Sequence, residues 1–193
     1  MWKSVVVRMR TGPGPRERLL EAAQRLTYLQ GANVGVDALL TEADVARRSL
    51  YEHFGGKDGL IAEVLRRSAS EDLGRYRTVM AAAGDDPSQR LLAIFDDLEN
   101  VVRQPDFRGC RYLAADLALS DPGHPAHAIT AGYRRQVHQL LADELIRLGH
   151  PRPDQAADEL HLLIEGVLAT GATRPEADPA RAARGLASRV LQQ

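Results

Sequence analysis

Proline and glycine residues divide the sequence into segments, and within each segment apolar residues recur at every third or fourth position. The dividing positions are Pro15, Gly31, Gly55–Gly56, Gly84–Pro87, Pro105, Pro125, Gly149, Pro153 and Pro179. Proline fits the first turn of a helix and glycine its C-terminal end, while a spacing of three to four is the period of an amphipathic helix. Val5–Val7 is β-like but stands alone. The sequence therefore predicts an all-α fold of about nine helices.

Length and composition exclude several classes of protein. A chain of 193 residues that is 44% hydrophobic is long enough for one large or two small domains with a buried core. Its single cysteine cannot form an internal disulfide, which fits a reducing compartment. Apolar runs stay short of the roughly 18–20 residues that a membrane span needs. We therefore expect a cytoplasmic protein that is neither secreted nor bound to a membrane.

The expected helices follow the segments. They cover approximately residues 15–30, 36–43, 46–53, 57–83, 87–104, 111–119, 125–148, 153–169 and 179–191. The first 70 residues carry a small excess of Lys and Arg, and the remainder a small excess of Asp and Glu. This asymmetry is a weak indication of a polyanionic partner for the N-terminal part.

Two short predicted helices, 36–43 and 46–53, are separated by only two residues. Helices joined by so short a turn have the spacing of a helix-turn-helix unit. In the second helix, Leu50 lies four residues before Phe54, so both side chains can pack inward together with Val45. The inward side of the unit is therefore apolar.

The outward side of the second helix carries Arg47, Arg48, Tyr51 and Glu52. An α-helix fits the major groove of B-DNA, where an Arg side chain can bind O6 and N7 of guanine together. Lys57 begins the next predicted helix, where its charge and the exposed backbone N–H groups suit a phosphate oxygen. These residues indicate double-stranded DNA as a partner.

Residues 46–60 read Ala-Arg-Arg-Ser-Leu-Tyr-Glu-His-Phe-Gly-Gly-Lys-Asp-Gly-Leu. This string resembles the Leu-Tyr-x-His-Phe-x-x-Lys-x-x-Leu signature of TetR-family transcriptional regulators. Leu19–Ala23 and Gly31 resemble the first helix of that family and its terminating glycine. The resemblance implies a homodimeric bacterial repressor, without a cofactor, that a small-molecule effector releases from operator DNA. It also implies an N-terminal arm and helix-turn-helix domain over residues 1–57, and an effector-binding and dimerisation domain over residues 58–193.

The resemblance further implies which side chains face DNA. The corresponding positions are Arg47, Arg48, Ser49, Tyr51, His53 and Lys57. Among them, the two arginines are placed for base edges, whereas the tyrosine, the histidine and the lysine are placed for phosphates.

Three positions depart from the family pattern. The usual glycine of the tight turn is Asp44, the serine that follows the turn's valine is Ala46, and the Ser or Thr that caps the second helix is Gly35. Aspartate tolerates the left-handed backbone region better than most residues, so we expect the turn to form. Neither Ala nor Gly offers a hydroxyl, so we expect weaker or shifted phosphate anchoring.

The later part of the chain carries a second resemblance. Arg108–Leu113 resembles a Gly-Cys motif at the start of a mid-chain helix in one large subgroup of the family, and His124–His127 resembles the start of the next long helix there. The expected effector-binding residues are Cys110, Tyr112, His138, His161 and Glu165. The cysteine is either a redox or ligand contact or a small buried hydrophobic residue. The last two residues, four apart, either bind a polar group of the effector or pair with each other.

Two further features each allow two interpretations. The arginines near the N-terminus either form an arm that binds DNA or belong to a frayed end; they are Arg8, Arg10, Arg16 and Arg18. The small residues Gly166, Ala169 and Gly171 allow a close helix crossing, either within the chain or between two subunits. In the second case, this helix and helix 125–148 would form a four-helix bundle in a homodimer.

Metal binding and catalysis find little support in the sequence. His124 and His127 can place two ligands on one helix face, but no nearby cysteine or carboxylate set completes a metal site. A Gly-rich phosphate loop, a nucleophile elbow and a Glu-x-x-His motif are all missing. We therefore expect neither a metal nor an enzyme. A helical ligand- or partner-binding protein with a weakened DNA-binding head stays open as an alternative, favoured by Gly35, Asp44 and Ala46.

Overall fold

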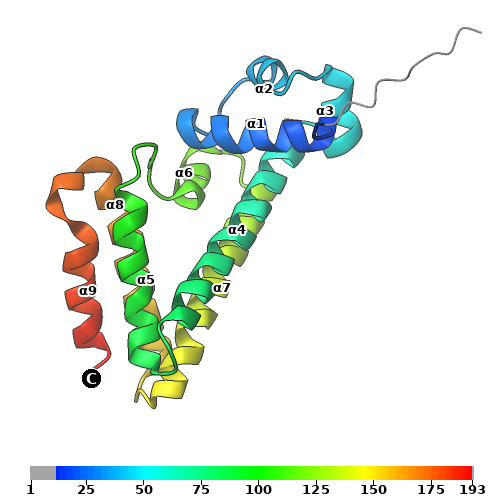
Figure 1. Cartoon of the computed structure of the whole chain (residues 1–193). Coiled ribbons are helices and arrows are strands. Elements are labelled where there is room, and N and C mark those ends of the chain that lie inside the picture. The colour runs from blue at the N-terminus through cyan, green and yellow to red at the C-terminus, as the bar shows by residue number, and fades with distance from the viewer. Residues whose placement is uncertain (1–11, 193) are drawn as a thin grey trace, which may run out of the picture.

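The computed structural model describes residues 12–192, and over these residues the all-α prediction is confirmed (Figure 1). The elements are α1 (Pro15–Gln30), α2 (Val36–Ala43), α3 (Arg47–Phe54), α4 (Lys57–Ala82), α5 (Pro87–Val102), α6 (Arg111–Ala118), α7 (Pro125–Leu148), α8 (Pro153–Thr173), η1 (Pro175–Ala177) and α9 (Pro179–Val190). Val5–Val7, Arg8 and Arg10 lie outside the described residues.

The first three helices and the beginning of α4 form a head with its own apolar core (Figure 1). Leu50 is only 1% exposed, and Val45 and Phe54 pack against the same cluster. The prediction that these three side chains point inward is therefore confirmed. Arg16 and Arg18 bind Glu63 and Asp44, so these two arginines lie within the head.

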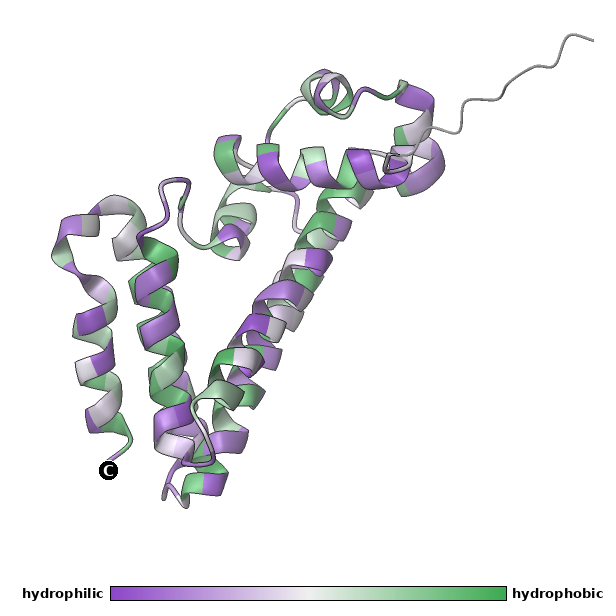
Figure 2. Cartoon of the chain, in the orientation of Figure 1, coloured by the Kyte–Doolittle hydropathy of each residue, from purple (hydrophilic) through white to green (hydrophobic). Residues whose placement is uncertain are grey.

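The remaining helices form a body below the head (Figure 1). In it, α4 and α7 run side by side away from the head, and α5, α8 and α9 pack together. Hydrophobic and hydrophilic residues alternate along the helices (Figure 2), as the spacing of three to four predicts. The short α6 lies close to α1, at the junction of head and body.

Helix α4 belongs to both cores. Leu60 and Val64 pack in the head cluster, whereas Ile61 and Leu65 pack in the body cluster. Because these residues are interleaved on one helix, α4 joins the core of the head to the core of the body. The predicted domain boundary after residue 57 falls just before this shared segment. It remains a proposal.

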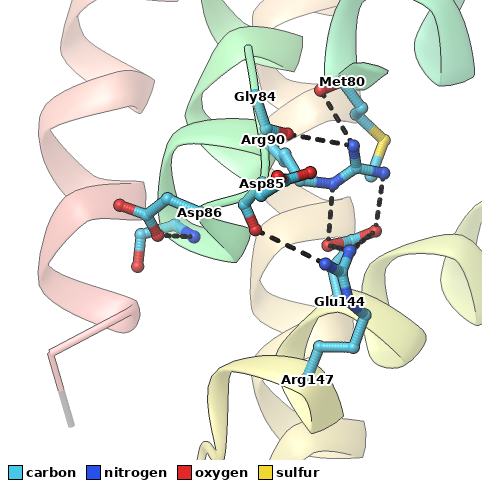
Figure 3. A network of polar contacts seen from close by, with 8 residues as sticks. Met80, Gly84, Asp85, Asp86, Arg90, Glu144 and Arg147 are labelled. Atoms are coloured by element: carbon cyan, nitrogen blue, oxygen red, sulfur yellow. Dashed lines mark hydrogen bonds and ion pairs between the residues drawn. The ribbon is translucent and has the colours of Figure 1, made fainter.

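The far end of α4 is held by a charged network (Figure 3). Arg90 on α5 donates to both carboxylate oxygens of Glu144 on α7, at 3.0 and 2.9 Å. The same guanidinium donates to the Met80 and Gly84 carbonyls, at 3.1 and 3.3 Å. Arg147 also binds the Glu144 carboxylate, at 2.7 Å. The network therefore joins the C-terminal end of α4 to α5 and α7.

Several helix ends differ by one or more residues from the sequence-based expectation, and two of these differences affect the later argument. Helix α3 begins at Arg47, because the backbone of Ala46 is extended and occupies the N-cap. Helix α8 continues to Thr173 rather than ending near Ala169. Gly171 lies inside this helix, at a position where a Cβ would lie 2.8 Å from Val102 Cγ1 on α5. The small residue therefore serves close packing within the chain.

Among the described residues, none of the helices combines the length and the apolar character needed to cross a bilayer.

Candidate nucleic-acid interface

The turn between α2 and α3 forms as expected. Asp44 adopts the left-handed conformation, with φ 49° and ψ 56°, and its backbone N–H donates to the Leu40 and Thr41 carbonyls. Its side chain accepts from Arg18 Nη1 at 3.1 Å. The aspartate therefore supplies the conformation for which glycine is usually needed, and α2 and α3 are joined by the short turn of a helix-turn-helix unit.

One side of α3 faces solvent although the other side is buried. Arg47, Arg48 and His53 are exposed, and Tyr51 is 57% exposed. Ser49 is half-buried at the edge of this side. The six predicted DNA-facing residues thus lie on α3 and on the first residue of α4, and we call this set the reader surface.

Both arginines of the reader surface have a carboxylate partner in the free protein. Arg47 Nη2 donates to Asp37 Oδ1 on α2 at 2.5 Å, and Arg48 Nε donates to Glu52 Oε1 at 2.5 Å. Asp37 escaped the sequence analysis because a carboxylate in the first turn of a helix is ordinary. Glu52 was identified as outward but was not assigned to the site, although it lies one turn after Arg48.

The four helices of the head begin without a side-chain cap, as far as residues 12–192 show. Their N-cap residues are Gly14, Gly35, Ala46 and Gly56. The first N–H groups of a helix need acceptors, and the helix dipole favours a negative one there. Phosphate oxygens meet both requirements. Lys57, half-buried at the first position of α4, adds a positive charge at one of these ends.

The predicted effector-binding residues separate into two groups. Cys110 and Tyr112 line a cavity of about 40 Å³ together with Asp72, Tyr76 and Tyr133. The Tyr112 hydroxyl donates to Asp72 Oδ2 at 2.7 Å, and its ring stacks on that of Tyr133 at 3.8 Å. We call this space the tyrosine cavity. Burial raises the pKa of Tyr76 to about 12, so its hydroxyl keeps its proton at neutral pH.

Cys110 has a local structural role. Its backbone is the N-cap of α6, and its Sγ accepts from the Leu113 backbone N–H at 3.5 Å. Burial raises the pKa of the Cys110 thiol, which keeps the sulfur in its less reactive, protonated form. These contacts favour a structural role for Cys110 over a redox role, while its place in the lining of the tyrosine cavity leaves a ligand contact open.

His138, His161 and Glu165 lie elsewhere, in an open depression on α7 and α8. Glu165 accepts from Arg134 Nε at 3.3 Å. Burial lowers the pKa of His161, which favours the neutral ring. The structure does not place these three residues around the tyrosine cavity, so the five predicted effector contacts do not share one pocket.

The two histidines near the start of α7 make protein contacts. His124 Nδ1 accepts from the Ala126 backbone N–H at 3.1 Å, and its Nε2 lies 3.4 Å from Asp58 Oδ1 on α4. His127 Nδ1 lies 2.8 Å from Asp116 Oδ1, and this hydrogen bond raises the pKa of His127. Within residues 12–192, no group of three or more His, Cys, Asp or Glu residues is arranged to hold a metal ion.

A single tyrosine connects the head to the segment before α6. The Tyr28 hydroxyl on α1 accepts from the Arg108 backbone N–H at 2.9 Å and lies 3.4 Å from the Gly109 carbonyl oxygen. The Arg111 guanidinium lies over the Tyr28 ring, 4.7 Å from its centre. These contacts join the start of α6 and the segment before it to the first helix of the head.

Known proteins resemble the head and the whole chain. Residues 19–64 match the model of a family described as bacterial regulatory proteins, tetR family. The TetR transcriptional regulator SAV143 of Streptomyces avermitilis is 34% identical, with a TM-score of 0.81 over 93% of this chain and 96% of that one. SCO4454, a TetR-family regulator of Streptomyces coelicolor, is 30% identical, with a TM-score of 0.82 over 92% and 94%. The HTH-type transcriptional regulator YjdC of Escherichia coli is 28% identical over 155 residues, which cover 79% of this chain and 81% of YjdC.

Proposed function

The chain belongs to the TetR family of bacterial regulatory proteins, and from this premise we propose that it is a cytoplasmic, non-enzymatic repressor. In this proposal, the reader surface binds operator DNA, and a small molecule in the body releases it. One observation carries the proposal. The polar side of α3 is exposed while its apolar side is buried in an intact helix-turn-helix unit. The alternative, a helical ligand- or partner-binding protein with a weakened DNA-binding head, loses the support of Asp44, because that residue completes the turn.

The roles within the reader surface follow from position and chemistry. Arg47 and Arg48, at the start of α3, are placed for base edges in the major groove. Tyr51 and Lys57, together with the uncapped N–H groups of the head helices, are placed for phosphates. In our proposal DNA replaces the carboxylate partners of both arginines, so binding includes the breaking of two exposed ion pairs, each of which contributes about 0–1 kcal/mol.

We propose the tyrosine cavity as the effector site. At about 40 Å³ it has room for only a few water molecules, so an effector must widen it. Such a ligand binds a conformation of the protein in which this cavity is wider, and so shifts the population toward that conformation. The Gly-Cys motif supports assignment to the subgroup that carries it, because Gly109, at φ +92°, lets Cys110 begin α6 beside the cavity.

A path for this coupling runs from the cavity to the head. Tyr112 binds Asp72 on α4, and the preceding Arg111 donates to Ser68 Oγ on the same helix at 3.0 Å. Because Arg111 also lies over the ring of Tyr28, an effector that displaces α6 acts on α4 and on α1 together. Coupling free energies between two such sites are usually about 1–3 kcal/mol, or about 5–150-fold in affinity.

We further propose that two subunits associate through the outer faces of α7 and α8. Leu162 on α8 is 71% exposed, and a Cβ at Gly166, one turn later, would meet nothing within 4 Å. A large exposed apolar side chain beside an exposed glycine suits a close helix crossing with a second copy. A dimer would present two reader surfaces about 34–36 Å apart, one turn of DNA.

Replacement of Lys57 by alanine tests its contact with phosphate. We expect Lys57→Ala to weaken binding to selected and to random duplexes alike, because a phosphate contact carries no sequence information. The slope of log Kd against log salt should fall by about 1, as measured by fluorescence anisotropy between 50 and 200 mM salt, a range in which the slope is steep. Arg181→Ala, an exposed change on α9, is the control and should leave the slope unchanged. An unchanged slope in Lys57→Ala would remove this residue from the phosphate contacts.

Replacement of Gly166 by leucine tests the subunit interface. In a two-fold dimer the added side chain appears twice, and overpacking costs about 1–3 kcal/mol at each site. We therefore expect Gly166→Leu to raise the dimer dissociation constant by about 30-fold or more, as measured by multi-angle light scattering at several concentrations. Gly185→Leu on α9, where a Cβ also meets nothing within 4 Å, should leave the dimer intact. Equal dimerisation by both variants would place the interface elsewhere.

A further inference from the structure

Arg48 and Glu52 form a pair on the most exposed part of α3. Arg48 Nε donates to Glu52 Oε1 at 2.5 Å, and 86% of the arginine side chain and 50% of the glutamate side chain are exposed. We propose that Glu52 is a specificity-determining residue, which accepts a hydrogen bond from the N4 amino group of a cytosine in the operator. The cytosine lies within one base pair of a guanine that Arg48 binds. This inference rests on the proposed function.

A carboxylate in the middle of a surface that must approach DNA has few favourable contacts there. Phosphate oxygens repel it, and so do N7 and O6 of guanine and O4 of thymine, which are acceptors on the major-groove edge. The donors on that edge are the amino groups of cytosine and adenine. Glu52 therefore disfavours guanine and thymine at the position it faces by repulsion, before any attractive contact forms.

Between the two remaining bases, cytosine fits a carboxylate better. The N6 amino group of adenine lies beside the acceptor N7, so the second oxygen of Glu52 would meet a lone pair. Cytosine itself presents only its N4 amino group as a polar group on that edge, and Glu and Asp are the side chains that accept from it. Arg48, held one turn away, has the complementary donors for guanine O6 and N7.

The pair also fits its place in the helix. Residues four apart on a helix are neighbours, with Cβ atoms about 5–6 Å apart, so the two side chains reach the same or adjacent base pairs, which are 3.4 Å apart along the axis. The ion pair of the free protein orders both side chains on one side of α3. In the complex, Arg48 exchanges Glu52 for the acceptors of guanine, and Glu52 exchanges Arg48 for the amino group of cytosine.

Selection from a random duplex library with the wild type and with Glu52→Gln tests the proposal. Glutamine keeps the shape of glutamate but offers both a donor and an acceptor, which suits N6 and N7 of adenine. We expect the wild type to select a half-site with a cytosine beside the guanine contacted by Arg48, and Glu52→Gln to select adenine there. A cytosine-to-thymine change at that position should weaken wild-type binding by about 5–150-fold, and the variant should lose most of this discrimination.

The chain offers a closely matched control. Glu71 on α4 accepts from Arg67 Nε at 3.0 Å with the same spacing of four residues, and 49% of its side chain is exposed. Because Glu71 lies on α4 rather than on the exposed side of α3, Glu71→Gln should select the wild-type sequence with wild-type discrimination.

Two outcomes would overturn the proposal while DNA binding stands. In the first, Glu52→Gln selects the wild-type sequence and keeps its preference for cytosine over thymine. In the second, the variant binds every duplex more tightly by one common factor, so that Glu52 acts only through its charge. A wild type that selects no sequence at all would instead overturn the proposed function.

Discussion

Replacement of Gly59 by alanine is expected to abolish operator binding, because it disrupts the junction between α3 and α4. A Cβ at Gly59, in the first turn of α4, would lie 1.9 Å from the Phe54 carbonyl oxygen at the end of α3. Real contacts never come so close, and the opposing atom is backbone that cannot rotate away. Overpacking a core usually costs about 1–3 kcal/mol, and we expect a loss at or above the upper end of this range here.

The consequence for function follows from the packing of the head. Phe54 and Leu60 lie on either side of this contact and pack in the same cluster as Leu50. If α4 moves away from α3 to accommodate the methyl group, the reader surface loses its fixed orientation. Urea unfolding should show the destabilisation, and the affinity for a selected duplex should fall to that for random DNA.

Gly74→Ala on the same helix is the control for this experiment. A Cβ there would meet nothing within 4 Å, and alanine stabilises a helix interior by about 0.5–1 kcal/mol relative to glycine. The two variants should therefore shift stability in opposite directions. If Gly59→Ala kept wild-type stability and operator affinity, the close approach of α4 to α3 would not be required.

The local features of the fold are those that the sequence predicts well. The turn at Asp44 depends on the backbone preference of one residue, and the inward positions of Leu50 and Phe54 depend on a spacing of four. Both features depend only on residues that are close together in the sequence. The same is true of the N-cap at Cys110, which lies at the start of a helix that the motif places correctly.

The tyrosine cavity depends on contacts between residues far apart in the sequence, which the sequence pattern does not predict. The motif around Cys110 indicated Tyr112 but could not indicate Asp72, which lies 40 residues away in sequence and binds its hydroxyl. Tyr133 has the spacing of an ordinary core residue on a long helix, so its stacking on Tyr112 left no signal. The residue type of His138 suggests an effector contact. The rotation of α7 about its axis places this side chain in the open depression on α7 and α8 instead of the tyrosine cavity.

The charged network at the base of α4 is another contact that only the fold creates, since Arg90 and Glu144 are 54 residues apart. Glu144 is 6% exposed, and two guanidinium groups, those of Arg90 and Arg147, bind its oxygens. Arg90 in turn satisfies the Met80 carbonyl at the end of α4 and the Gly84 carbonyl beyond it. This arrangement fixes one end of the helix whose other end carries the head.

Replacement of Glu144 by alanine should therefore affect both stability and the end of α4. Removal of one partner of a buried ion pair costs about 3–5 kcal/mol, and we expect about 3 kcal/mol here because Arg147 is half exposed. For a chain of this length the melting temperature should fall by about 6–12 °C. Amide hydrogen exchange in residues 80–84 should become faster, because Arg90 loses the carboxylate that holds it against their carbonyls.

The neighbouring carboxylate provides the control, and a milder variant separates charge from shape. Asp143 is exposed and accepts from the side chain of Gln139 at 2.7 Å, so Asp143→Ala should change the melting temperature by little. Glu144→Gln keeps an acceptor for Arg90 but loses the charge, and should fall between the wild type and Glu144→Ala. If Glu144→Ala melted like Asp143→Ala and left exchange in residues 80–84 unchanged, the network would not anchor α4.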